Sequence, residues 1–172
     1  MRYVALLRGV NVGRAKRVAM ADLRQVFADL GFTDVKTLLN SGNVVFSSSR
    51  KPSPAKIEQA VLDRTGVSSK VTLVAGAELA KAAADCPLLD IATDPSRLAM
   101  AVLASPGDAR KLRPLADRDF TPERLSVGSR VAYIWCPDGF AASNVSNAIA
   151  EVLGDGVTTR NWATVQKILA AL

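Results

Sequence analysis

Apolar residues recur along this chain with the spacing of amphipathic helices and short strands. Residues 19–30 are an example, because Leu23, Val26 and Phe27 fall on one helical face there. In the first half the pattern predicts the order strand, helix, strand, strand, helix, strand and short helix. The predicted ranges are residues 2–8, 19–30, 35–40, 43–47, 54–65, 70–74 and 77–84. Ser41 and Gly42 form the predicted tight turn between the second and third strands.

The same order of elements returns in the second half. The predicted elements are a strand over 98–104, a helix from Pro106 to about 115, a hairpin over 124–136, a helix over 144–153, a strand over 156–159 and a helix over 161–171. This split βαβ order is typical of a ferredoxin-like arrangement, in which helices pack on one face of an antiparallel sheet. We therefore expect an α+β protein, a tandem repeat of two ferredoxin-like halves. Residues 1–86 form the basic first half, and residues 87–172 form the second half with the C-terminal helix.

The chain has no histidine and two cysteines. The absence of histidine excludes Ser/His and Cys/His nucleophilic pairs and removes the commonest zinc ligand. Cys86 and Cys136 are each followed by proline, and we interpret them as ordinary buried or half-buried thiols rather than as a redox pair. Oxygen-only Mg²⁺ binding stays open, but no acidic cluster points to it, so neither a metal nor a cofactor is expected.

The apolar stretches are too short for membrane insertion or secretion. None approaches the about 18 apolar residues of a membrane span, and residues 3–7 are too short for a signal-peptide core. We predict a cytoplasmic protein with no membrane partner. The oligomeric state is left open.

Positive charge is concentrated in the first half. Residues 1–86 hold 13 Lys and Arg against 7 Asp and Glu, whereas the second half is balanced at 9 of each. Five basic residues precede the first acidic one, Asp22; they are Arg2, Arg8, Arg14, Lys16 and Arg17. Such a field favours anionic partners, and the alternative is a basic surface that only maintains solubility.

Three segments are candidates for binding an anion: the loop after the first strand, the turn at 40–43 and residues 158–162. In the loop after the first strand, Gly9 and Gly13 allow a close backbone approach, Asn11 adds an amide, and the loop's basic residues add charge. It matches neither a Walker A loop nor GxGxxG, and a simple glycine turn is the alternative. The turn at Ser41 and Asn43 offers a hydroxyl and an amide, although these are also ordinary turn residues. The predicted ligand-binding residues are Arg8, Gly9, Asn11, Gly13, Arg14, Ser41, Asn43, Arg160 and Asn161.

Two aromatic-containing segments have structural alternatives. Residues 158–162 precede the last predicted helix, and a Thr or Asn there can cap it while Trp162 packs inward; Arg160 is what capping leaves unexplained. Tyr133 and Trp135 share one strand face and would stack bases if exposed. We expect both to be buried.

An ordered set of motifs resembles a bacterial family known as domain of unknown function 1697. The motifs are Arg8–Gly13 (RGVNVG), Met20–Arg24 (MADLR), Leu30–Thr33 (LGFT), Ser41–Phe46 (SGNVVF), Pro137–Gly139 (PDG), Thr158–Trp162 (TTRNW) and Thr164–Lys167 (TVQK). The resemblance covers essentially the whole chain and implies a tandem ferredoxin-like fold, with no activity attached. Arg14 and Ala19 stand where the family commonly has a glycine and a proline.

Three functions remain open at this point. The first is a binding module for a phosphate-bearing ligand, a nucleotide or a nucleic acid, on the basic first half. The second is a histidine-free enzyme for a small anionic substrate, with Asp22 or Lys16 as its base; no other catalytic residue is indicated. The third is a regulatory domain that binds other proteins through its sheets.

Overall fold

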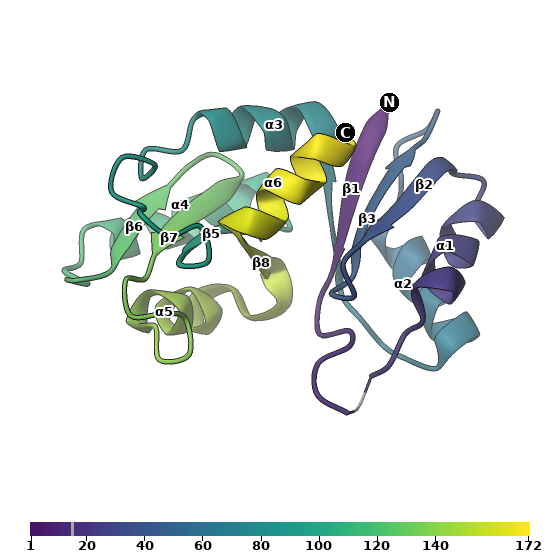
Figure 1. Cartoon of the computed structure of the whole chain (residues 1–172), viewed down its shortest axis with the longest axis horizontal. Helices are drawn as coiled ribbons and strands as arrows, with labels where there is room; N and C mark the ends of the chain where they lie inside the picture. Colours follow the sequence, from purple (N-terminus) through teal and green to yellow (C-terminus); the bar gives the residue numbers. More distant parts are fainter. Residues whose placement is uncertain (15) are drawn as a thin grey trace. The chain divides into compact units, whose positions relative to one another are not determined.

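The computed structural model describes residues 1–14 and 16–172, and they form two compact units. Met1–Leu79 and Lys167–Leu172 make up the first unit, and Ala80–Gln166 make up the second. Each unit contains one four-stranded antiparallel sheet with helices packed on it (Figure 1). The described residues thus form two sheets and six α-helices, which confirms the predicted α+β class.

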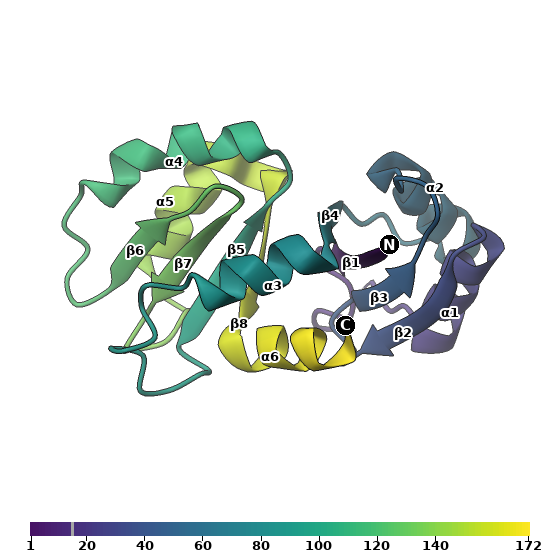
Figure 2. The same ribbon diagram turned by 90° about the horizontal axis from the view of Figure 1, so that it is seen from above.

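The first unit is organised around its central strand β1. Its elements are β1 (Arg2–Leu7), α1 (Met20–Asp29), β2 (Thr33–Leu38), β3 (Asn43–Ser47), α2 (Pro54–Thr65), β4 (Val71–Ala75) and the start of α3 (Gly76–Ala84). The strands lie in the order β2-β3-β1-β4, and Ala5 of β1 pairs with Val44 of β3 and Leu73 of β4. Helices α1 and α2 lie side by side on one face of this sheet (Figure 2).

The second unit repeats this order. Its elements are β5 (Leu98–Leu103), a 3₁₀ turn (Pro106–Asp108), α4 (Ala109–Ala116), β6 (Arg124–Val127), β7 (Val131–Trp135), α5 (Asn144–Leu153), a 3₁₀ turn (Gly154–Gly156), β8 (Val157–Asn161) and α6 (Trp162–Ala171). The strand order is β6-β7-β5-β8, which corresponds strand for strand to the first sheet. The two sheets are therefore consistent with the predicted two-half repeat.

Helices α3 and α6 account for the difference between the predicted halves, 1–86 and 87–172, and the two compact units. Each helix directly follows the fourth strand along the chain of one of the two sheets. The last residues of α3, from Ala80, belong to the second unit, and those of α6, from Lys167, belong to the first. In the second unit, Tyr133 donates a hydrogen bond from its hydroxyl to the carbonyl oxygen of Ala82 at 2.6 Å. In the first unit, Arg2 Nη1 donates to the carbonyl oxygen of Ala171 at 3.3 Å.

Each unit has an apolar core between its sheet and two helices. In the first, Phe27 of α1 meets Phe46 of β3 edge to face with ring centroids 5.0 Å apart, and both side chains are fully buried. In the second, Leu112 of α4 and Ile149 of α5 cover the sheet. All six residues of β5 are buried, which explains its uninterrupted apolar sequence, since a strand covered on both faces needs no polar alternation.

Local sequence signals determine the ends of several elements. Helix α2 spans the predicted residues 54–65, with Ser53 Oγ accepting a hydrogen bond from Lys56 N at 3.4 Å and Gly66 following with φ of 71°. Two predicted strands have wrong boundaries. Strand β2 spans Thr33–Leu38 rather than 35–40, and it ends before the four-residue turn 39–42. Strand β8 extends to Asn161 because its residues pair with β5, a long-range contact that no local pattern reveals.

The second sheet also accounts for the aromatic pair and the thiols. Tyr133 and Trp135 are 4% and 9% exposed, so the expectation that they are buried is confirmed. Burial, followed by the nearby charges of Cys86 and Asp85, raises the pKa of Tyr133 to about 12. Cys86 and Cys136 are buried free thiols, as expected. Over the described residues, no helix combines the length and the apolar character needed to cross a bilayer.

Candidate anion-binding loop

The segment from Arg8 to Val18, here called the basic loop, is anchored at both ends in the first unit. Val10 and Val18 are 2% and 4% exposed and belong to the apolar core. Asn11 ties the two ends together, because its Nδ2 donates to Val18 O at 3.0 Å and its Oδ1 accepts from Val18 N at 2.8 Å. At the start of the loop, Arg8 O accepts a hydrogen bond from Ser69 Oγ at 2.8 Å. The base of the basic loop is therefore fixed by both its core and its hydrogen-bond contacts.

A second segment, the turn 39–42, lies against the basic loop. Asn11 Nδ2 also donates to Asn40 O at 2.7 Å, and Leu7 N donates to Gly42 O at 2.8 Å. Gly42 is buried with φ of 77°, and a Cβ there would lie 2.5 Å from Val10 Cγ2. Only glycine fits this contact without displacing its neighbour. The turn thus sets the position of the loop from one side.

Every second residue of the basic loop from Gly9 to Gly13 has a positive φ. Gly9, Asn11 and Gly13 have φ of 70°, 54° and 64°, whereas Val10 and Val12 between them do not have positive φ. Residues that alternate between right-handed and left-handed conformations turn successive N–H groups toward one side, where they attract anions. Non-glycine residues with positive φ are uncommon, and Asn is among those that tolerate it best.

Positive side chains surround this backbone. Arg14, Lys16 and Arg17 are exposed, and the sequence has no acidic residue before Asp22. Lys16 folds back over the loop, so its Nζ lies 4.0 Å from the position that a Cβ on Gly9 would take. Lys16 has φ of 55°, and its carbonyl oxygen accepts from Asn11 N at 2.9 Å. Ala15, within the loop, lies outside the described residues.

The amides predicted to bind a ligand have structural roles. Asn11 ties the loop, as described, and Asn43 Nδ2 donates to Leu38 O and to Ser41 Oγ, each at 2.9 Å. Asn161 Oδ1 accepts a hydrogen bond from Thr164 N at 2.9 Å and so caps α6, which was the alternative weighed for this segment. Among the predicted polar ligands, the basic side chains thus retain the strongest case for a direct contact with an anion.

Arg160 and Asn161 belong to the second unit, whereas the other predicted site residues belong to the first. Arg160 pairs with Met100 across β8 and β5, and its Nη1 donates to Thr159 O at 3.0 Å. Burial lowers the pKa of Arg160 to about 10. A guanidinium in such surroundings stays charged at neutral pH and is suited to an anionic partner.

The proposed catalytic base Asp22 is engaged elsewhere. Its Oδ1 lies 3.2 Å from Arg64 Nε, which links the first turn of α1 to the end of α2. Half of this side chain is exposed, an arrangement typical of a surface ion pair and of no special reactivity. The structure described here contains no group of three or more His, Cys, Asp or Glu side chains able to share a metal ion.

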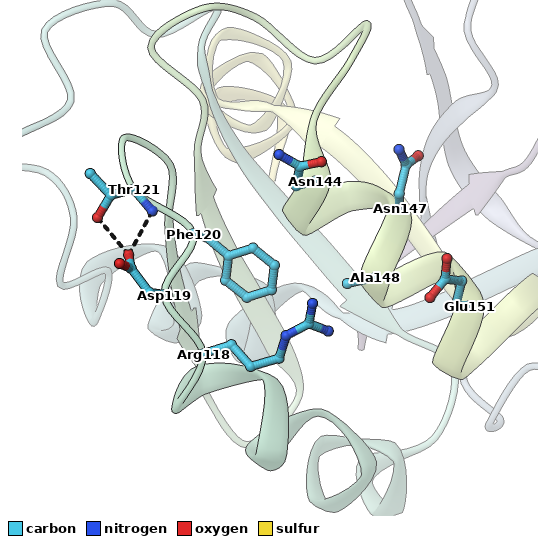
Figure 3. A pocket seen from close by; sticks show the side chains of 8 residues that line it. All are labelled: Arg118, Asp119, Phe120, Thr121, Asn144, Asn147, Ala148 and Glu151. Atoms are coloured by element: carbon cyan, nitrogen blue, oxygen red, sulfur yellow. Dashed lines mark hydrogen bonds between the residues drawn. The ribbon is translucent and has the colours of Figure 1, made fainter.

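Sequence reasoning missed a polar hollow in the second unit. Its volume is about 440 Å³, and it lies between the loop after α4 and one face of α5 (Figure 3). The loop contributes Arg118, Asp119, Phe120 and Thr121, and the helix contributes Asn144, Asn147, Ala148 and Glu151. The spacing of the α5 residues was the only available signal, since positions three, four and seven apart share a helical face.

Comparison with known proteins gives one family model and two solved structures. The model of the family described as "Protein of unknown function (DUF1697)" matches residues 1–133. The solved structure of conserved bacterial protein SP0830 from Streptococcus pneumoniae has a TM-score of 0.72 at 23% identity and covers 99% of this chain and 97% of that one. Protein BT0572 from Bacteroides thetaiotaomicron aligns at 14% identity over 96% and 95% of the two chains, with a TM-score of 0.23. No curated protein matches. The likeness to SP0830 shows a shared fold.

Proposed function

Because this chain belongs to the DUF1697 family, whose description assigns no activity, we propose a function from its geometry: it binds a phosphate-bearing ligand on the basic loop. The main observation in support is that the loop combines positive φ at Gly9, Asn11 and Gly13 with exposed positive charges. These charges belong to Arg14 and Lys16. Backbone N–H groups of the loop other than that of Asn11, which donates to Lys16 O, hold the anion, and the side chains neutralise it. Nucleotides and nucleic acids are the candidate ligands.

The rigid base of the loop supports binding by a prepared site. Asn11 fixes the loop ends through three hydrogen bonds, and Gly42 packs beneath Val10. A loop already held in position loses less conformational entropy on binding. Arg8 begins the basic loop, and Ser41 belongs to the turn 39–42 that lies against it. We also propose that the chain is a tandem repeat of two ferredoxin-like halves. The matching strand orders β2-β3-β1-β4 and β6-β7-β5-β8 support this fold.

The test is calorimetric titration with inorganic phosphate, ATP and a short single-stranded oligonucleotide at two salt concentrations. We expect at least one of them to bind, and to bind more weakly at high salt, because exposed charges are screened. A double variant Arg14→Gln/Lys16→Gln should weaken binding about tenfold or more. The matched control is Arg50→Gln/Lys51→Gln, which removes the same charge from an exposed connector before α2. Equal affinities in the two variants would refute the site.

A second candidate function is binding to another protein. Leu89 and Ile91 are each 45% exposed in the connector that follows α3, and exposed large aliphatic side chains are common in protein interfaces. Sedimentation of the wild type and of Leu89→Ser/Ile91→Ser separates this function from the first. Self-association of the wild type that does not change with salt, and that is lost in the double variant, would favour protein binding through this connector.

A further inference from the structure

The hollow beside α5 in the second unit contains two opposite charges, those of Arg118 and Glu151. Among the described residues, neither Arg118 nor Glu151 forms an ion pair or a side-chain hydrogen bond. Arg118 extends into the space between the loop and α5, and Glu151 lies on the helix at the far end (Figure 3). A guanidinium and a carboxylate that line one hollow and do not pair with each other can each pair with a ligand.

Other side chains give the hollow a polar wall and an apolar floor. Phe120 is partly buried against the core, and the Arg118 guanidinium carbon lies 5.0 Å from its ring centroid, which holds the cation in place. Asn144 and Asn147, one helical turn apart, present amide groups along the opposite side. An amide both donates and accepts, so this pair is matched to a peptide group.

Two further carboxylates near the hollow are already occupied. Asp119 Oδ1 accepts from Thr121 N at 2.9 Å and from Thr121 Oγ1 at 2.6 Å. Glu123, in an adjoining hollow of about 210 Å³, accepts from Ser143 Oγ at 2.7 Å and from backbone N–H groups at the start of α5. Glu151 is therefore the carboxylate that a bound cation would meet.

We propose that this hollow binds a small zwitterion of the peptide class, with its carboxylate on Arg118, its ammonium near Glu151 and its amides against Asn144 and Asn147. A volume of about 440 Å³ suits a short peptide rather than a single small ion. A molecule with only one charge satisfies only one of the two side chains, so the hollow discriminates by charge pattern. This site is in the second unit and does not depend on the basic loop.

The experiment is protein-detected NMR titration of the full chain with triglycine, N-acetyltriglycine and triglycine amide. The two blocked peptides each lack one terminal charge. We expect triglycine to shift the amide signals of the lining residues and to bind at least tenfold more tightly than either blocked peptide. Glu151→Gln should erase the preference for triglycine over N-acetyltriglycine, and Arg118→Gln should erase its preference over triglycine amide.

Matched controls separate the site from a general change of surface charge. Arg113→Gln on α4 and Asp138→Asn in the turn after β7 alter the same charges at exposed positions outside the hollow, and both should retain the wild-type preferences. Failure of triglycine to perturb these signals at millimolar concentration would overturn the proposal. Equal binding of all three peptides, or equal effects of site and control variants, would also overturn it.

Discussion

Asn11 donates a hydrogen bond from Nδ2 to the carbonyl oxygen of Asn40 at 2.7 Å, and this contact joins the basic loop to the turn between β2 and β3. The same nitrogen donates to Val18 O at 3.0 Å, while Oδ1 accepts from Val18 N at 2.8 Å. One side chain thus satisfies backbone groups from two separate segments. The position of the loop's cations depends on this residue even though its amide is already bonded.

Replacing Asn11 with Ala should destabilise the protein and loosen the basic loop. The variant loses all three side-chain hydrogen bonds and places alanine at φ of 54°, where asparagine is better tolerated. We expect a loss of about 1–3 kcal/mol in the free energy of unfolding, measured by urea denaturation. Amide hydrogen exchange should increase at residues 11–18 and remain unchanged in the second unit.

Asn11→Asp is a second variant, because it keeps an oxygen for Val18 N but places a carboxylate oxygen, instead of the donor, against the carbonyl oxygens of Val18 and Asn40. At neutral pH its loss of stability should be at least as large as that of alanine, because this oxygen repels both carbonyl oxygens. A stable Asn11→Ala variant with unchanged exchange in the loop would show that other contacts hold the loop in place.

Glu123→Gln should reduce stability at neutral pH by about 1–2 kcal/mol. Burial opposes ionisation of Glu123, but hydrogen bonds from Ser143, Asn144 and Val145 outweigh it and lower its pKa from the ordinary 4.5. The pKa of Glu123 is lower in the folded protein than in the unfolded one. The carboxylate therefore stabilises the folded protein fully above about pH 4.5, and this stabilisation is lost as the pH falls through the folded pKa.

Urea denaturation at pH 7 and at pH 3 measures this dependence. The difference between the wild type and Glu123→Gln should shrink at the lower pH, where the wild-type carboxyl is increasingly protonated. Asp138→Asn, an exposed acid in the same unit, should show no comparable difference at pH 7. If the wild type and Glu123→Gln differ by the same free energy of unfolding at both pH values, the carboxylate does not have the assigned role.

Local patterns were sufficient to predict the order and type of the elements. The predicted helix over 54–65 matches α2 because its cap, apolar spacing and terminal glycine all lie within a short stretch. Strand β8 was predicted too short, since Arg160 and Asn161 extend it through pairing with β5. Such pairing depends on residues about 60 positions away, which no local signal encodes.

In the candidate site, too, local signals predicted some features, whereas others depend on long-range contacts. Glycine and basic residues indicated the basic loop, and Gly9 and Gly13 do have positive φ. The amide of Asn11 was predicted to contact a ligand, whereas it bonds to Val18 and Asn40, partners whose proximity arises only from the fold. The hollow beside α5 was missed because its residues come from a loop and one helical face, and none belongs to a motif.

Both thiols should react slowly with a disulfide reagent while the protein is folded. Burial raises the pKa of Cys86, and burial also raises that of Cys136 to about 12 from the ordinary 9.0, despite the opposing hydrogen bond with Ser143. The thiolate is the nucleophile in this reaction. At pH 8 the fraction of Cys136 present as thiolate should be about a thousandfold smaller in the folded protein than in the unfolded one. Absorbance of the released thiol follows the reaction.

Cys136→Ser isolates the reaction of Cys86, which is 7% exposed against 0% for Cys136. In the wild type, Cys86 should therefore provide the faster phase, and both thiols should react at once in denaturant. Rapid modification of both thiols in the folded protein would contradict the observed burial.

Gly42→Ala should be more destabilising than Gly31→Ala, although both glycines have positive φ, at 77° and 81°. A Cβ at Gly42 would lie 2.5 Å from Val10 Cγ2 and 2.8 Å from Leu7 Cβ, whereas one at Gly31 meets no atom within 4 Å. Backbone strain is thus common to both variants at about 1 kcal/mol, and overpacking adds about 1–3 kcal/mol at Gly42 alone. Urea denaturation gives both values. Equal losses would mean that Val10 moves away without cost, in which case Gly42 does not fix the basic loop, and phosphate binding should then survive in Gly42→Ala.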